Sequence, residues 1–184
     1  MTNPQVTANS TSIPVTLLST PLCIDPKGNE GLNPQKTEPT NPLYSLDKQQ
    51  SSLVYYDKNT IVLTMPYWVK VTNSSVEDSE VKKHSFVLSY DPEAMTASDT
   101  KLKLYISHVV EDAGETVTRS NFTYAYRAYS IRAALAAFKE KTGKLPKYLE
   151  LTAEINNSKD ELVDKDGKET SVERSVEYDY AFTE

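Results

Sequence analysis

The sequence has little of what several common protein classes require. Its 184 residues include one cysteine, Cys23, which excludes an internal disulfide framework and a cysteine-rich metal site. No apolar run approaches the ~20 residues that a membrane-spanning helix needs. The N-terminus has no charged segment followed by an apolar core, so we expect synthesis in the cytoplasm without a signal peptide. The five glycines are scattered, and none opens a helix as a phosphate-binding loop would require.

Catalytic signatures are equally scarce. There is no Gly-x-Ser-x-Gly motif, and Cys23 has no general base placed beside it by the sequence. His84 and His108 lie far apart in apolar rows, so we interpret them as core or rim histidines. An acidic run at 160–169 does not match the spacing of an EF-hand loop. We therefore expect no enzyme, no metal and no cofactor.

The first 50 residues are the most distinctive part of the chain. They contain seven of the ten prolines, which prevent long helices and strands. We predict an extended proline-rich arm over residues 1–51 and a folded domain over residues 52–184. Alternating apolar residues suit the arm to pairing with a sheet edge, either of its own domain or of a neighbouring subunit. The candidate partner-binding residues of the arm are Ile13, Val15, Leu17, Leu22 and Ile24.

One helix is predicted, from Ser130 to Thr142. Ser130 is a preferred N-cap residue, and Gly143 is the expected left-handed terminator. A helix of about 13 residues is unstable alone in water, so we expect its apolar stripe to dock on a sheet. That stripe would consist of Ile131, Ala134, Leu135 and Phe138.

Strands are predicted over most of the remaining chain, because apolar residues alternate with a period of two. Pro66 interrupts the clearest row and indicates an edge position or a bulge. A tight-turn sequence at 111–114 predicts a hairpin between the strands on either side of it. A second turn sequence at 164–167 predicts a closing hairpin. A two-residue turn there would set Ile155 beside Tyr178 on one face of the sheet. A three-residue turn would place the two apolar rows on opposite faces unless a bulge intervened, and the sequence does not decide between these two turns.

These elements define the expected fold class. About seven strands without β-α-β alternation predict a mainly β protein, an antiparallel β-sandwich or a partly open barrel. One α-helix (130–142) would cover an open end or a face, and the long extended N-terminal arm would precede the domain.

Aromatic residues offer one candidate ligand face, made of Trp68, Phe122, Tyr124 and Tyr126. The last three share one face of a strand whose opposite face carries arginine and asparagine. One face must point inward, so we interpret the aromatic row as the buried one. The alternative is an exposed row that stacks on sugar rings, as in a carbohydrate-binding module.

Charge is distributed unevenly, although the net charge is only −6. Residues 119–147 contain seven basic residues and one acidic residue, whereas residues 150–184 contain eleven acidic and four basic residues. Opposed patches could steer one copy against another, although ordinary solvation explains them as well. The candidate patch residues are Arg119, Arg127 and Arg132 on the basic side and Glu173, Glu177 and Asp179 on the acidic side.

The sequence thus favours a non-catalytic structural or assembly protein. We expect a virion component, such as a capsid decoration or tail-accessory protein of a phage, whose arm docks on other protein subunits by strand addition. The partners would be further copies in a homo-oligomer or a larger virion-like assembly, with no nucleic acid and no membrane. A carbohydrate-binding module that uses the tyrosine and tryptophan face is the alternative.

Overall fold

The computed structural model describes residues 41–112, 117–157 and 171–182. These residues form seven strands and two helices, so the predicted mainly β fold is confirmed. The strands are β1 (Ser52–Asp57), β2 (Thr60–Val69), β3 (His84–Ser89), β4 (Lys101–Val110), β5 (Asn121–Ser130), β6 (Tyr148–Ile155) and β7 (Val172–Asp179). The helices are α1 (Asp78–Val81) and α2 (Arg132–Thr142).

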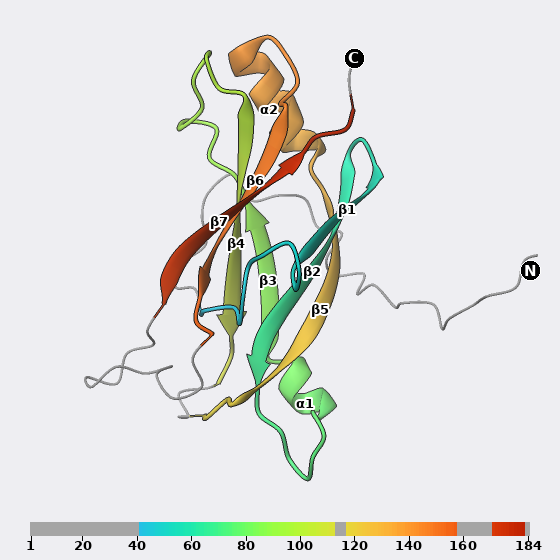
Figure 1. The fold of residues 1–184 in the computed structure, drawn as a ribbon, viewed down its shortest axis with the longest axis vertical. Helices are drawn as coiled ribbons and strands as arrows, with labels where there is room; N and C mark the ends of the chain where they lie inside the picture. The colour runs from blue at the N-terminus through green and yellow to red at the C-terminus, as the bar shows by residue number, and fades with distance from the viewer. Residues whose placement is uncertain (1–40, 113–116, 158–170, 183–184) are drawn as a thin grey trace, which may run out of the picture.

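The strands form two sheets, with α2 at one end of the molecule and α1 at the other (Figure 1). The three-stranded sheet has the order β1-β2-β5, and the four-stranded sheet has the order β3-β4-β6-β7. Neighbouring strands are antiparallel except for β4 and β6, which are parallel. This pair differs from the antiparallel expectation because β5 and α2 carry the chain back to the end where β4 begins.

The predicted hairpin around residues 111–114 is wrong. β4 pairs with β3 and β6, whereas β5 lies in the other sheet and pairs with β2 over its whole length. The inward side chains Ala125 and Tyr129 of β5 are buried in the core from that sheet. A turn sequence marks a local change of direction, and it does not determine which sheet receives the next strand.

The closing hairpin forms between β6 and β7, but its register is not the one that a two-residue turn would give. Ile155 pairs with Val172, and Tyr178 pairs with Leu149. The two apolar rows therefore share one face and contribute to the core. The predicted turn at 164–167 lies outside the described residues.

Helix α2 docks its apolar stripe on the core as predicted, with Ala134, Leu135 and Phe138 buried. Gly143 ends the helix in the left-handed conformation, at φ 73°. The predicted N-cap is wrong. Ser130 is the last residue of β5, and Ile131 occupies the cap position without a side-chain cap. The backbone N–H of Ile131 donates instead to the carbonyl oxygen of Asn59 at 2.7 Å, which ties the helix start to the β1–β2 turn.

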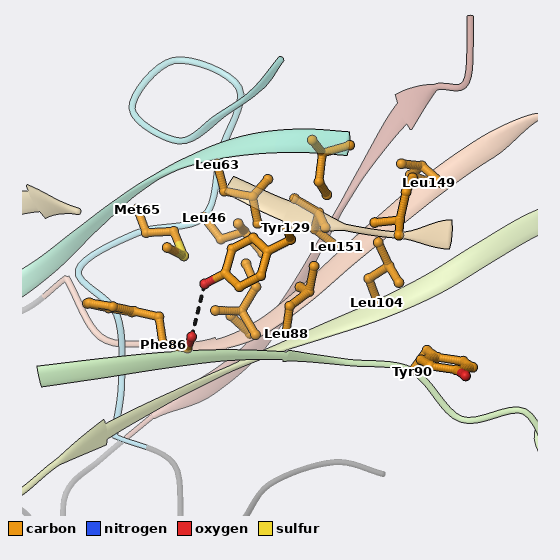
Figure 2. Packing of buried hydrophobic residues seen from close by; sticks show 14 of the residues in the cluster. Leu46, Leu63, Met65, Phe86, Leu88, Tyr90, Leu104, Tyr129, Leu149 and Leu151 are labelled. Atoms are coloured by element: carbon orange, nitrogen blue, oxygen red, sulfur yellow. Dashed lines mark hydrogen bonds between the residues drawn. The ribbon is translucent and has the colours of Figure 1, made fainter. Parts of the chain in front are cut away.

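An apolar core fills the space between the two sheets (Figure 2). Leu63 and Met65 enter it from the three-stranded sheet, and Leu104 and Leu151 enter from the four-stranded sheet. The hydroxyl of Tyr129 crosses the core and donates to the Phe86 carbonyl oxygen at 3.0 Å (Figure 2). Tyrosine allows this crossing because its ring is apolar and its tip can satisfy a backbone acceptor.

Three further tyrosines bridge the sheets on the side where β1 approaches β7. Tyr55 donates to the carbonyl oxygen of Asp179, at 2.9 Å. In the opposite direction, Tyr178 and Tyr180 donate to the carbonyl oxygens of Ser51 and Lys58, at 3.1 and 2.8 Å. We call Tyr55, Tyr178 and Tyr180 the tyrosine clasp.

Residues 41–51, at the end of the predicted arm, pack into the domain. Leu43 and Leu46 are core residues, and Leu43 forms bridges with Tyr67 of β2 and Ile155 of β6. This segment also explains how β2, the central strand of its sheet, accommodates Pro66, which has no backbone N–H to donate. β1 stops pairing at Thr64, and beyond that point the Pro66 carbonyl accepts the Tyr44 N–H, so the missing proline N–H interrupts no β1 hydrogen bond.

Candidate functional site

Two parts of the molecule carry enough unusual chemistry to be considered as sites. The first is a buried charged cluster near α1. Glu80 comes from α1, His84 opens β3 and His108 lies in β4, while Asp112 and Arg119 lie between β4 and β5. The side chains of Glu80, His84 and His108 are buried even though all three can carry charge.

Arg119 holds the acidic side of the charged cluster together. Its Nε donates to Glu80 Oε1 at 2.7 Å, and its two terminal nitrogens donate to the carboxylate of Asp112 at 2.7 and 2.6 Å. The same Glu80 oxygen accepts the backbone N–H of Lys70 at 2.9 Å. A guanidinium that forks onto a carboxylate in this way forms strong, directional hydrogen bonds.

The two histidines extend the charged cluster toward the N-terminal segment. His84 Nε2 lies 3.3 Å from Glu80 Oε1, and His84 Nδ1 lies 2.9 Å from His108 Nε2. His108 Nδ1 lies 3.4 Å from the Pro42 carbonyl oxygen. Two neutral imidazoles supply two N–H protons for these three contacts. A third proton can enter only by charging a ring inside the core.

The electrostatics favour neutral rings and charged carboxylates. Burial lowers the pKa of His108 to about 3, and the nearby charge on His84 and Arg119 acts in the same direction. Burial also lowers the pKa of His84, although Glu80 opposes that shift. Burial alone would raise the pKa of Glu80, but the hydrogen bonds from Lys70, Arg119 and His84 outweigh it and hold that pKa below its ordinary value.

This arrangement suits a structural role better than catalysis. Glu80 already accepts three hydrogen bonds through one oxygen, so it is poorly placed to act as a general base. The cavity beside it measures about 100 Å³, well below the ~300 Å³ at which ligand pockets begin. Among the described residues, no group of three histidine, cysteine, aspartate or glutamate side chains could hold a metal ion.

The predicted charge patches are brought together only in part. The side chain of Arg119 is 10% exposed and belongs to the charged cluster, while Arg127 points inward and lies over the ring of Phe86. Arg132 is exposed at the start of α2. The acidic residues do gather, because Glu173, Glu177 and Asp179 all lie on the outward side of β7.

The second candidate is the outward surface of the three-stranded sheet. Alternation along β1, β2 and β5 places one row of each strand on this surface, and the pairing aligns Val54 with Val62 and Val62 with Ala128. Among the described strands, these outward rows carry one charged residue, Asp57 at the end of β1, where a register shift pairs it with Thr60. We call this surface the uncharged face and define it by Ser52, Val54, Tyr56, Val62, Thr64, Phe122, Tyr124, Tyr126 and Ala128.

The other sheet provides an internal comparison. Its outward positions carry Lys101, Lys103, Glu150, Glu154, Glu173, Glu177 and Asp179. Lys101 forms ion pairs there with Glu150 and Glu177, at 3.4 and 2.5 Å. This is the usual surface of a sheet with one face in solvent, and the uncharged face lacks it entirely.

The interpretation of the aromatic row as buried is wrong. Phe122 and Tyr124 are each 39% exposed, because Ala125 and Tyr129 form the inward row of β5. β1 adds two more apolar residues to the same surface, with Val54 58% and Tyr56 82% exposed. The prediction considered β5 alone and assigned its larger side chains to the core, so it exchanged the inward and outward faces of this strand.

The geometry also limits the predicted ligand face. Trp68 is buried beneath Tyr44 and donates its indole N–H to the Asn156 carbonyl oxygen at 2.7 Å. The rings of Phe122 and Tyr124 are nearly perpendicular, at 82°, so they do not form the flat platform on which a sugar ring stacks.

The residues that sequence reasoning missed are Val54 and Tyr56 on the uncharged face, Tyr44, whose ring stacks on Phe122 of that face, and Glu80 in the charged cluster. The absence of charge from alternate positions of 52–56 and 62–64 could have indicated the first group. No sequence pattern indicates Glu80, because the residues of the charged cluster come together only in the folded chain. The predicted arm residues Ile13, Val15, Leu17, Leu22 and Ile24 lie outside the described residues.

The fold is similar to that of a solved protein from Bacteroides fragilis. A "putative lipoprotein" of Bacteroides fragilis is similar over 98% of this chain and 81% of its own, with 27% identity and a TM-score of 0.68. An uncharacterized protein of Parabacteroides merdae and a DUF1344 protein of unknown function from Bacteroides vulgatus are 13% and 11% identical, with TM-scores of 0.43 and 0.39. They share 89% and 83% of this chain, which spans 64% and 56% of theirs. The chain matches no model of a protein family, and no curated protein is significantly similar to it in sequence.

These findings correct the predicted function and location. The similar structure from B. fragilis is described as a lipoprotein and not as a virion or phage protein, so the prediction of a phage component in a virion is wrong. That prediction assumed that residues 1–51 borrow their order from a neighbour, whereas the part of this segment that the structure describes packs on its own domain. Within the described ranges, no helix has both the length and the apolar character needed to span a bilayer.

Proposed function

We propose that this chain is a non-catalytic protein-binding domain of the bacterial cell envelope, and that it holds its partner on the uncharged face. The observation that carries the proposal is the contrast between the two outward sheet surfaces. One is covered with lysine and glutamate, and the other exposes valine, phenylalanine and tyrosine, with Asp57 at the end of β1 as the one charged residue in its described outward rows. Contiguous apolar surface of this kind is typical of sites where proteins associate.

A protein is a more suitable partner for this face than a nucleic acid or a small ligand. The chain carries a net charge of −6, which disfavours nucleic acid. The face is a sheet surface, and the rings of Phe122 and Tyr124 on it stand nearly perpendicular, at 82°, so it offers little enclosure to a small molecule. Exposed tyrosine and phenylalanine are residues that protein interfaces favour.

The envelope location is supported by the lipoprotein of B. fragilis, which is similar over nearly the whole chain. A covalent lipid holds a protein at a membrane surface without a membrane-spanning helix. The domain itself would then face an aqueous compartment and bind another protein there. The non-catalytic part of the proposal is supported by the charged cluster, in which the Arg119 guanidinium already pairs with the carboxylates of Glu80 and Asp112.

Site-specific photo-cross-linking in the native cell tests this function. A photoreactive phenylalanine analogue is placed at Tyr124 on the uncharged face and, as the matched control, at Lys103 on the outward surface of the other sheet. We expect a discrete protein adduct in the envelope fraction from position 124 and none from position 103. Equal adducts from both positions, or none from position 124, would contradict the proposed function.

A further inference from the structure

We infer that the occupant of the uncharged face is a second copy of this chain, packed face to face as a weak homodimer. The inference rests on the proposed function and deepens it by naming the partner.

The shape of the face suits packing against another sheet. Its central strand contributes the modest side chains Val62 and Thr64, while larger side chains stand on the strands to either side. On β1 these are Val54 and Tyr56, and on β5 they are Phe122, Tyr124 and Tyr126. Two twisted sheets pack by interdigitating such side chains, and a two-fold axis lets one surface serve both copies.

Charge favours the identical face over other partners. A partner that placed a lysine or glutamate on this surface would lose hydration without gaining an ionic partner. The described part of this chain offers one sheet surface whose only charged outward residue is Asp57, at the edge formed by the end of β1, and a second copy presents the same surface. Two copies that each carry −6 repel one another least when they approach through their least charged surface.

The size of the face sets the expected affinity. Three strands of up to ten residues cover roughly 33 Å by 14 Å, about 460 Å², against the ~800 Å² per partner of a standard interface. The dimer should therefore be weak, with a dissociation constant on the order of 10 µM. Tethering at a membrane surface would raise the effective concentration enough to populate such a dimer.

Sedimentation equilibrium of the purified full chain from 1 to 200 µM tests the inference. We expect a reversible shift from the monomer mass of 20.6 kDa toward twice that value. Tyr124→Lys and Val54→Lys should abolish the shift, because each buries an unpaired charge at the interface. Ser85→Lys, an exposed outward position of β3, is the matched control and should leave the shift unchanged.

Hydrogen exchange provides a second readout that needs no variant. Amides of β1 and β5 should exchange more slowly at 200 µM than at 1 µM, and amides of β7 should not change. A wild-type chain that stays monomeric at 200 µM would overturn the inference, as would lysine variants that fold and dimerise normally. Protection of β1 and β5 that does not depend on concentration would assign the face to residues 1–40 of the same chain and would also overturn it.

The two proposals fail in different ways. A monomeric purified chain that still gives a position-124 adduct with a different protein in cells would refute the second copy and retain the protein-binding function. A chain that dimerises in solution and gives no adduct from position 124 in cells would refute the proposed function alone.

Discussion

At the residue scale, the charged cluster shows how a small β protein can bury three titratable side chains, Glu80, His84 and His108, and half-bury two more, Asp112 and Arg119. Arg119 bridges the carboxylates of Glu80 and Asp112, and Glu80 in turn faces His84. Each charge has a partner within hydrogen-bond distance, which is the condition under which buried charge is tolerated. The cluster links α1 to the segment between β4 and β5, two strands that belong to different sheets.

Replacing Glu80 tests the stabilising role of the charged cluster. Glu80→Gln keeps the shape of the side chain but turns an amide toward Arg119 and leaves that guanidinium with one carboxylate. We expect the free energy of unfolding to fall by about 3 kcal/mol. Urea denaturation measures it, and the matched control Glu77→Gln, an exposed glutamate at the start of α1, should change it by less than about 0.5 kcal/mol. A cost for Glu80→Gln no larger than that of the control would refute this role.

The histidine pair makes stability depend on pH. Burial depresses the pKa of His108 to about 3, so the unfolded chain binds a proton below pH 6.5 that the native chain does not. Stability from this group is therefore present above pH 6.5 and is lost as the pH falls toward 3. Between pH 6.5 and about 5 the loss should be about 1.5 kcal/mol for this histidine, and His84 shifts in the same direction.

This pH window isolates the histidines, because the ordinary pKa values of Glu80 and Asp112 lie below it. The chain has only two histidines, so no other imidazole contributes. Chemical denaturation at pH 6.5 and 5 should show a smaller difference for His108→Phe, whose ring can still stack on Phe86. An identical pH difference in the variant and the wild type would show that His108 is not the source.

At the scale of the elements, the tyrosine clasp carries a specific expectation. Tyr178→Phe and Tyr180→Phe remove one cross-sheet hydrogen bond each and leave a carbonyl without that donor. Each should lower the free energy of unfolding by about 1 kcal/mol. Tyr56→Phe, whose parent residue is 82% exposed, is the matched control and should be neutral in thermal or urea unfolding. A neutral result for both clasp variants would mean that the two hydroxyls contribute nothing measurable.

The elements also show what the sequence could and could not predict. Alternation identified most strands, and the stripe from Ala134 to Phe138 correctly predicted a docked helix ending at Gly143. The sheet that receives β5 was not predictable, because partner choice depends on long-range packing and not on the local turn. The N-cap failed for a related reason, since β5 continues through Ser130 and the first turn bonds to Asn59.

At the scale of the whole molecule, the two outward surfaces of the sheets differ more than their sequences suggest. Sequence reasoning found Phe122, Tyr124 and Tyr126 as a group but placed them inside, because large aromatic residues usually enter the core. The inner space next to β5 is instead filled by Ala125, Tyr129 and the core residues of other strands. Only the folded chain shows that β1 and β5 together present an uncharged surface.

The charge patches illustrate the same limit. The sequence located the acidic residues of β7 correctly as a group, because neighbouring outward positions of one strand stay together. It could not show that Arg119 forms ion pairs with Glu80 and Asp112, whereas Arg132 is exposed to solvent. Ion pairs between residues 39 positions apart leave no local pattern.

The most direct test of the central claim is the accessibility of the uncharged face inside the cell. In a Cys23→Ser background, a cysteine is introduced by Tyr124→Cys or, as the control, by Lys103→Cys, and its labelling by a permeant maleimide is timed in cells and in dilute purified protein. The account predicts that the cysteine at 124 reacts rapidly in the dilute protein and slowly in cells, whereas the one at 103 reacts rapidly in both. Equally fast labelling of position 124 in cells and in dilute protein would show that nothing covers the face and would contradict the account.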